Sequence, residues 1–326
     1  MPPKALVTGA TGFIGGHLTE ELVRRGWEVS CWSRPQSRTS RLDHMPVSVW
    51  KGSLDDLDRL RQAVAAQDYV FHLAARIHSA PRKVYERVNH IYTRNLVRAC
   101  RDASGPLRRL VYVSSIAAAG PSRPGHIKTE TAPCRPSSEY GRSKLRGEEA
   151  VRQAGPDLPF TIIRPPNVYG PRQRETALLI WLIRKRVVPV LRKREPCTSL
   201  IYVKDLNQGL IQAALSPVAA GQTYYLTDGK IYSWHRVLFT LKDILLGPSL
   251  YLPLPEALIA MAAAAADGLK RVRLLRAYFG RRAWASMTQT PWLFSASQAR
   301  IELGFAARYS LEQGLRDTLE HFPHGH

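Results

Sequence analysis

Short apolar runs alternate with amphipathic stretches along the first half of the chain. The runs are rich in β-branched residues, as buried strands are, and the stretches between them repeat apolar residues every three or four positions, as helices do. Strands are expected at residues 5–8, 29–32, 47–50, 69–74, 110–114 and 160–164, and helices at 13–25, 57–66, 84–101 and 138–153. Strands that are each followed by a helix form a parallel sheet covered on both faces. The pattern therefore predicts an α/β fold with a doubly wound parallel sheet.

The alternation becomes irregular after residue 170. Prolines at 171, 189, 196, 217, 248, 253 and 255 divide this half of the chain into shorter elements. We expect a first domain over residues 1–170 and a smaller substrate-binding or capping region over 171–326. Segments near 199–216 and 223–227 carry two more strand candidates and a helix, and they are expected to return to the main sheet.

A glycine-rich turn joins the first strand to the first helix. Its glycines are spaced three and three, so that one permits the tight turn, one lets the backbone approach a pyrophosphate and one lets the helix pack on the strand. The helix N-terminus then faces the anion. An ordinary glycine-rich loop is the alternative, but the position between strand and helix favours a Rossmann-type dinucleotide site. It would be formed by Gly9, Thr11, Gly12, Phe13, Ile14 and Gly15.

The end of the second strand bears on which dinucleotide is bound. The sequence there is Cys31-Trp32-Ser33-Arg34, without the carboxylate that would bind the adenosine ribose. Arg34, with Arg38 and Arg41 nearby, can pair with a 2′-phosphate, which favours NADP over NAD. If Arg34 only stacks on adenine, both cofactors would bind.

A tyrosine and a lysine four residues apart offer proton-transfer chemistry. Tyr140 and Lys144 lie on one face of the helix expected over 138–153. A fixed positive charge favours the phenolate of a nearby tyrosine, which lets that tyrosine act as general acid or base. Ser115, at the end of the strand expected over 110–114, is the candidate that holds the substrate oxygen. Ser114 is the weaker alternative for that role, or a hydrogen bonder at the strand end beside the cofactor.

Five motifs occur in one order along nearly the whole chain: TGATGFIGGHL, FHLAA, VYVSS, YGRSK and IIRPPNVYGP. Together they resemble the extended short-chain dehydrogenases/reductases, the epimerase/dehydratase group. The resemblance implies a nicotinamide cofactor, the catalytic set Ser115, Tyr140 and Lys144, and a homodimer built on the helices at 84–101 and 138–153. It also implies that the cofactor groove is lined by Leu73, Ala74, Ala75, Asn89 and Pro166, and that Asn167 faces the substrate.

Two positions depart from the family pattern. Ser53, followed by Leu54, replaces the usual aspartate near adenine, and Lys204 stands where an acidic residue is usual. His72, in FHLAA, is interpreted as a core histidine rather than a catalyst.

The substrate half leaves several functions open. Its tail, from Trp292 to Phe322, resembles both the epimerases and the 3β-hydroxysteroid dehydrogenase-like branch. Basic and apolar residues alternate around 270–282 and around 184–194, which suits contact with an anionic membrane surface, although solvated faces, a dimer surface or a diphosphate site are alternatives. We expect oxidation or reduction of a lipophilic, sterol-like substrate, with decarboxylation as an option. A nucleotide-sugar epimerase or dehydratase is the alternative, and a non-catalytic NADP sensor is the hypothesis from another class.

Composition adds limits rather than a function. The net charge of +21 favours an anionic partner, yet no motif specific for nucleic acid is present, and the arginines can equally be solvated helix faces. The four cysteines show no metal-ligand spacing, so no metal site is expected, and they fit a reducing compartment. No signal peptide pattern is seen, and the apolar stretch 252–266 is interrupted by prolines and a glutamate. The expected location is the cytoplasm, with peripheral contact to the inner membrane face as an option.

Overall fold

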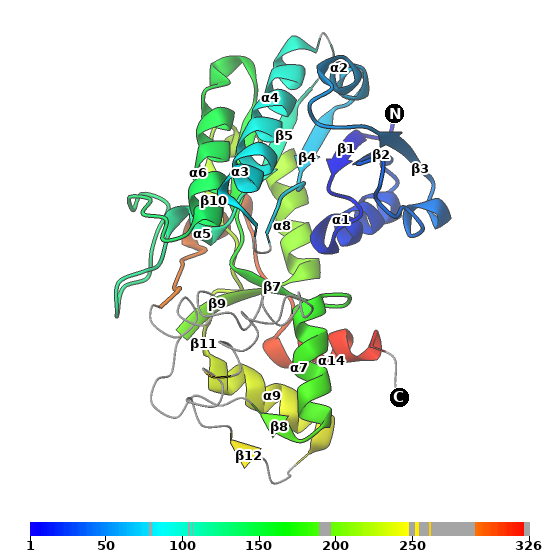
Figure 1. Cartoon of the computed structure of the whole chain (residues 1–326). Helices are drawn as coiled ribbons and strands as arrows, with labels where there is room; N and C mark the ends of the chain where they lie inside the picture. The colour runs from blue at the N-terminus through cyan, green and yellow to red at the C-terminus, as the bar shows by residue number, and fades with distance from the viewer. Residues whose placement is uncertain are drawn as a thin grey trace.

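In the computed structural model, residues 1–77, 80–103, 105, 107–188, 197–247, 252–253, 261 and 291–322 are described, and the account below concerns these residues. Seven strands form the main sheet in the order β10-β6-β5-β4-β1-β2-β3, and every neighbouring pair is parallel (Figure 1). The strands are β1 (Lys4–Thr8), β2 (Glu28–Ser33), β3 (Val47–Lys51), β4 (Tyr69–His72), β5 (Arg109–Val113), β6 (Phe160–Arg164) and β10 (Thr223–Tyr225). The predicted doubly wound parallel sheet is confirmed.

Helices cover both faces of this sheet. Consecutive strand residues point to opposite faces, so Leu6 packs under one helical layer and Val7 under the other. One layer contains α1 (Phe13–Arg24) and α8 (Val203–Leu215), which contact each other. The other layer contains α2 (Leu57–Ala65), α4 (Tyr92–Asp102) and α6 (Glu139–Arg152). Short elements complete the lobe: η1 (Leu42–His44), α5 (Ile116–Ala119), η3 (Gly155–Asp157) and η4 (Pro217–Ala219).

The single helix expected over residues 84–101 is three elements. It consists of α3 (Arg82–Tyr85), a π-helical segment η2 (Glu86–Ile91) and α4. A π-helical turn closes its hydrogen bond over one more residue than an α-helical turn, and such turns are frequent at functional sites. The fully buried Asn89 lies within this segment.

The smaller lobe has its own three-stranded sheet, in the order β11-β9-β7. Its strands are β7 (Asn167–Tyr169), β9 (Cys197–Tyr202) and β11 (Ile231–Ser233). The prediction that the strand near residues 199–203 returns to the main sheet is therefore wrong. At the outer edge of β6 the partner is β10, so β9 cannot pair there. Instead β9 pairs with β7, which follows the two prolines after β6. Both α8 and β10 do return to the main lobe, as expected.

The smaller lobe is completed by helices that pack on its sheet. A shared apolar core joins α7 (Arg174–Arg184), α9 (Trp234–Leu246) and α14 (Leu311–Glu320) to β9 and β11. Two residues of β8 (Val187–Val188) pair with β12 (Leu252–Pro253), and α13 (Ser297–Leu303) lies against α8 and β10. Among the described helices, none is long and apolar enough to cross a bilayer.

A polar contact fastens the two lobes together just after residue 170. The guanidinium of Arg172 binds both carboxylate oxygens of Glu20 on α1, at 2.6 and 2.7 Å. It also donates to Nδ1 of His17 at 2.8 Å, while Nε2 of the same ring binds the carbonyl oxygen of Pro171 at 3.0 Å. Arg172 has a left-handed φ of 71°, which is unfavourable for a residue with a Cβ, so these contacts hold it in place. The boundary near residue 170 is thus a joint rather than a free linker.

Candidate active site

The glycine turn forms a cradle that suits a pyrophosphate. Gly9 has a φ of 80°, and a Cβ at this position would lie 2.8 Å from the backbone of Leu73 and Ala74. A Cβ on Gly15 would lie 2.2 Å from the carbonyl oxygen of Gly9. Helix α1 begins after Gly12, and no side chain caps the N–H groups of its first turn. The predicted groove residues 73 and 74 therefore lie beside the turn, and the site fits a dinucleotide.

The end of β2 presents a hydroxyl and a cation. Ser33 is only 3% exposed, and its Oγ has no hydrogen-bond partner among the described residues. An orphaned buried hydroxyl is unusual and suits a site that a ligand completes. Arg34 follows it and is exposed. Arg41 lies against Gly16 of α1, where a Cβ on the glycine would come within 2.7 Å of the Arg41 Nη1. Ser33 was missed at the sequence level, and its place as the last residue of β2 was the available signal.

The residues after β3 are held by local hydrogen bonds. Ser53 Oγ accepts from the backbone N–H of Asp55 at 3.2 Å, and Asn95 Nδ2 donates to the carbonyl oxygen of Leu54 at 3.0 Å. The serine that replaces an aspartate here thus stabilises the turn that leads into α2.

The structure brings the three predicted catalytic residues together. Helix α6 begins at Ser138, whose hydroxyl caps Gly141 N–H at 3.0 Å, and this places Tyr140 in the first turn. The hydroxyl of Ser115 lies close enough to the Tyr140 phenol to act on its pKa. One turn further, Lys144 Nζ donates to the carbonyl oxygen of Val113 at 2.7 Å, and it lies 4.3 Å from the centre of the Tyr112 ring.

Burial changes the acidity of both groups on α6. It raises the pKa of Tyr140 to about 12, although the nearby hydroxyl of Ser115 acts in the opposite direction. It lowers the pKa of Lys144 to about 7, and the nearby Glu148 carboxylate limits this fall. At neutral pH Tyr140 is therefore a neutral phenol, able to donate a proton to an oxygen that Ser115 also contacts.

Two buried residues support this arrangement. Asn89 accepts from the backbone N–H of Arg76 at 2.7 Å, and its Nδ2 lies 3.0 Å from the carbonyl oxygen of Arg76 and 2.9 Å from Ser143 Oγ on α6. His72 is fully buried and lies between Thr8 Oγ1 at 2.6 Å and Thr93 Oγ1 at 2.9 Å. Burial lowers the pKa of His72 to about 3, so it is a neutral core residue, as expected.

Other predicted site residues have different positions. The hydroxyl of Ser114 points to α6 and donates to Glu148 at 2.6 Å, so it is a hydrogen bonder at the strand end. Pro166 is buried, whereas Asn167 is exposed, with its Nδ2 3.3 Å from Thr198 Oγ1. An apolar cluster follows Ser115, and its members are Ile116, Ala119, Tyr225, Phe294, Cys134 and Trp292.

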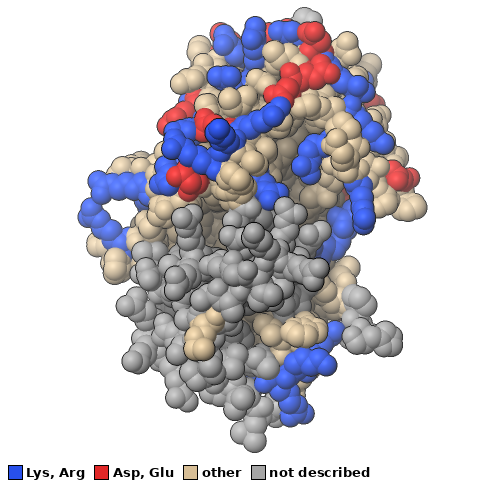
Figure 2. Space-filling model, in the orientation of Figure 1, with Lys and Arg blue, Asp and Glu red and all other residues tan. Residues whose placement is uncertain are grey.

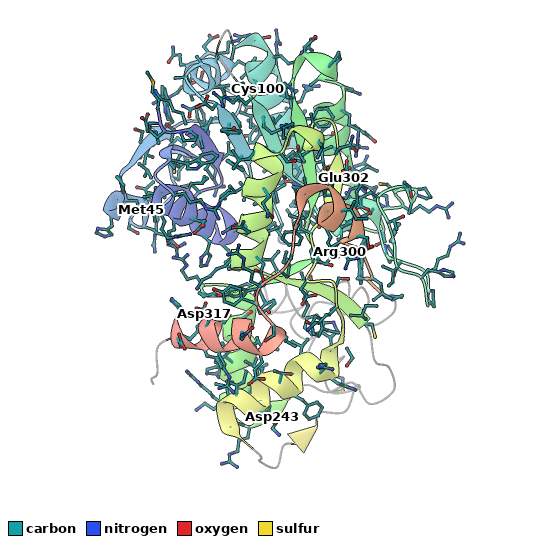
Figure 3. The ribbon with its side chains drawn as sticks, turned by 180° about the vertical axis from the view of Figure 1, so that it is seen from behind. Met45, Cys100, Asp243, Arg300, Glu302 and Asp317 are labelled. Carbon is teal, nitrogen blue, oxygen red and sulfur yellow. The ribbon has the colours of Figure 1, made fainter. Side chains whose placement is uncertain are left out.

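Lys204, which departs from the family pattern, has an acidic partner on another helix. Its Nζ lies 2.8 Å from Asp317 on α14, so the acidic partner comes from the end of the chain (Figure 3). Among the described residues there is no metal-binding cluster of His, Cys, Asp and Glu. The basic residues expected at 192–194 and 270–282 lie outside the described residues.

Three comparisons place the chain among known proteins. Residues 5–226 match the model of the NAD dependent epimerase/dehydratase family. A ceramide reductase from Caulobacter vibrioides is 30% identical over 90% of this chain and 82% of that protein. A decarboxylating sterol-4-alpha-carboxylate 3-dehydrogenase from Dictyostelium discoideum is 25% identical over 95% of this chain and 98% of that protein. The structure of UDP-glucuronic acid 4-epimerase from Bacillus cereus in complex with NAD covers 98% of both chains, with a TM-score of 0.76 at 21% identity.

The matched family region covers more than half of the chain and contains the glycine turn and all of α6. The chain is therefore an NAD-dependent enzyme of the epimerase/dehydratase family, an extended short-chain dehydrogenase/reductase.

Proposed function

We propose that this enzyme transfers a hydride between a nicotinamide cofactor and a secondary alcohol or ketone of a lipophilic substrate. The nearness of Ser115 to Tyr140, with Lys144 one turn further along α6, carries the proposal, because it brings two hydroxyl groups together at the end of β5. There Ser115 holds the substrate oxygen and Tyr140 exchanges its proton. The bound dinucleotide supplies or accepts the hydride. Lys144 favours the phenolate form of Tyr140 when the substrate is an alcohol.

NADP is the proposed cofactor. Ser33 offers an unpaired buried hydroxyl and Arg34 an exposed guanidinium, and no carboxylate occupies the end of β2. A guanidinium pairs well with a phosphate group, whereas it does not replace the carboxylate that binds a ribose 2′-OH.

A lipophilic substrate is favoured over a nucleotide sugar. The apolar cluster of Ile116, Phe294 and Trp292 begins directly after Ser115. The contact between Asn167 and Thr198 on the substrate side is neutral. The two relatives named above are a ceramide reductase and a sterol dehydrogenase, both with lipid substrates in their names. In a sterol-like substrate that carries a carboxylate on the carbon adjacent to the oxidised one, oxidation would give a β-keto acid, which readily loses carbon dioxide.

We also propose that the smaller lobe contacts an anionic membrane surface at the end of α7. Trp181 is 55% exposed there, and it is followed by the exposed residues Arg184, Lys185 and Arg186. Figure 2 shows basic side chains on the smaller lobe as well as the many on the main lobe. An aromatic ring beside several cations suits the interface of a bilayer, where a lipophilic substrate resides.

The function is tested by following NADPH and NADH oxidation with long-chain and sterol-like ketones, and the reverse reaction with the alcohols. UDP-sugars form the comparison set. We expect turnover with a lipophilic ketone or alcohol, faster with the phosphorylated cofactor, and a loss of at least about 100-fold in Tyr140→Phe. Phenylalanine keeps the ring, so cofactor binding by this variant serves as the control. Full turnover by Tyr140→Phe would refute the catalytic assignment, and activity confined to UDP-sugars would refute the substrate class.

A further inference from the structure

The carboxylate of Glu148 has no role in the chemistry above, yet many contacts converge on it. Glu148 is fully buried on α6, one turn beyond Lys144. Its Oε1 accepts from Ser114 Oγ at 2.6 Å and from Arg164 Nε at 2.8 Å, while Oε2 accepts from Arg164 Nη2 at 2.6 Å. Charge-assisted, bidentate hydrogen bonds of this kind are strong and fix geometry. Glu148 is therefore an anchored negative charge inside the active-site wall.

Three successive turns of α6 hold the three residues at the end of β5. These contacts join Tyr140 to Ser115, Lys144 to Val113 and Glu148 to Ser114. Tyr140 and Lys144 thus make the first two contacts between α6 and this strand end, and Glu148 makes the third. Loss of the third contact would remove the link between the Ser114 side chain and α6, next to Ser115.

Glu148 also determines the charge around Lys144. The described titratable groups near Lys144 are His72 from β4, Tyr112 from β5, and Tyr140 and Glu148 from α6. At neutral pH, His72 and the two phenols are uncharged, because burial lowers the pKa of His72 and raises those of Tyr112 and Tyr140. The carboxylate of Glu148 is the negative charge in this group, and it raises the pKa of Lys144.

We propose that Glu148 is a positioning residue of the active site, which holds the end of β5 against α6 through Ser114 and places a fixed negative charge one turn from Lys144. Arg164 on β6 fixes Glu148 in turn, and its Nη1 donates to the hydroxyl of Tyr225 on β10 at 3.1 Å. The catalytic helix is thereby connected to the edge of the main sheet. This proposal rests on the proposed function, in which Tyr140 and Lys144 handle the substrate proton.

Cofactor affinity provides a test that does not require turnover. Lys144 is expected to hydrogen-bond the nicotinamide ribose. The Kd for NADP⁺ should therefore rise as the pH increases through the Lys144 pKa of about 7, because the ammonium group loses its proton. In Glu148→Gln we expect this midpoint to move to lower pH by about one unit, because the carboxylate charge is lost. Glu148→Asp keeps the charge and should restore the wild-type midpoint. Arg152→Gln is the matched control, since Arg152 binds the same carboxylate at 3.1 Å from the exposed side of α6.

The outcomes separate the two proposals. A folded Glu148→Gln protein with the wild-type midpoint overturns the role of Glu148, as does a wild-type affinity that is constant from pH 6 to 9. If Glu148→Gln does not fold, the double variant Glu148→Gln/Arg164→Gln removes both buried charges and is used in the same titration. Its midpoint should fall by less than in the single variant, because the loss of the Arg164 charge partly offsets the loss of the Glu148 charge. If NADP⁺ binds as expected but no alcohol or ketone reacts, only the proposed function fails.

Discussion

Tyr140 is a weaker acid than a free tyrosine, because burial raises its pKa. With a pKa of about 12 the phenol keeps its proton throughout the neutral range. Reduction of a ketone needs a protonated donor, so the side chain is already in the required form. Oxidation of an alcohol needs the phenolate, whose formation depends on positive charge at Lys144 and on the oxidised nicotinamide ring. The same side chain can thus serve as proton donor in reduction and, once ionised, as proton acceptor in oxidation.

At the same scale, the proposed preference for NADP depends on Ser33 and Arg34. In Arg34→Ala we expect the affinity for NADP⁺ to fall about 10- to 100-fold, because a charge-assisted hydrogen bond contributes about 1.5–3 kcal/mol. The affinity for NAD⁺ should change little. In Ser33→Asp the new carboxylate should repel the 2′-phosphate and bind the ribose, so that NAD⁺ becomes the preferred cofactor. Titration of both dinucleotides by intrinsic fluorescence or calorimetry measures these changes.

Arg108→Ala is the control for this experiment, since Arg108 is exposed and lies just before β5, at the opposite ends of the parallel strands from Arg34. An equal loss of NAD⁺ and NADP⁺ affinity in Arg34→Ala would mean that this guanidinium contacts a part common to both cofactors, such as adenine.

At the scale of elements, the π-helical segment η2 connects two walls of the site. Its extra residue places Asn89 where one amide binds the backbone of Arg76 twice and the hydroxyl of Ser143 once. A regular α-helix over the same residues would rotate the amide away from these partners. Through Asn89, the irregular turn therefore connects α6 to the segment that follows β4.

Asn89→Ala should lower the free energy of unfolding by about 2–4 kcal/mol, because it leaves buried backbone groups without partners. Asn95→Ala, which removes one hydrogen bond to Leu54, should have an effect of about 1 kcal/mol. Urea unfolding followed by circular dichroism measures both. Equal, small effects for the two variants would show that the Asn89 contacts do not stabilise the fold.

The elements differ in how far the sequence could predict them. The strands of the main sheet were predictable because parallel strands buried on both faces are continuous apolar runs. The π-helical segment was not predictable, because one extra residue in a single turn hardly changes the spacing of the apolar residues from that of an α-helix. The partner of β9 was also not predictable, because a strand pattern shows which face is buried but not which edge is free. Ser115, Tyr140 and Lys144 could be found from spacing and motif order, whereas Glu148 needed the distances to Ser114 and Arg164.

At the scale of the whole molecule, two buried histidines should make the protein sensitive to acid. Burial lowers the pKa of His17 to about 4 and that of His72 to about 3, below the unfolded value of 6.5. Below pH 6.5 the unfolded chain binds more protons than the folded one, so stability falls as the pH decreases from 6.5 towards 4. Each histidine adds a slope of up to about 1.4 kcal/mol per pH unit.

His72→Asn keeps a polar side chain between Thr8 and Thr93 and removes one titrating group. Between pH 5 and 6.5, where most carboxylates are already ionised, the unfolding free energy of this variant should depend less steeply on pH. The slope should be smaller by the contribution of one histidine. Chemical denaturation at several pH values measures this slope. An unchanged slope would contradict the assignment of His72 as a neutral buried group.

Membrane contact is also a property of the whole molecule. Vesicles with anionic lipid should retain the protein in sedimentation, and vesicles of neutral lipid should not. The triple variant Arg184→Gln/Lys185→Gln/Arg186→Gln should weaken this binding roughly 100-fold, at about 1 kcal/mol for each charge. The triple variant Arg24→Gln/Arg101→Gln/Arg108→Gln removes the same charge from exposed positions on the main lobe. Equal losses in both variants would show that net charge, rather than the end of α7, determines the binding.

The contact of Arg172 with Glu20 and His17 limits how the two lobes can move. A hinge rotation at residue 170 would have to break a bidentate ion pair and expose a buried imidazole, while releasing Arg172 from a strained backbone angle. Domain opening on this side is therefore disfavoured. The groove for the dinucleotide phosphates should therefore keep its width whether or not substrate is present.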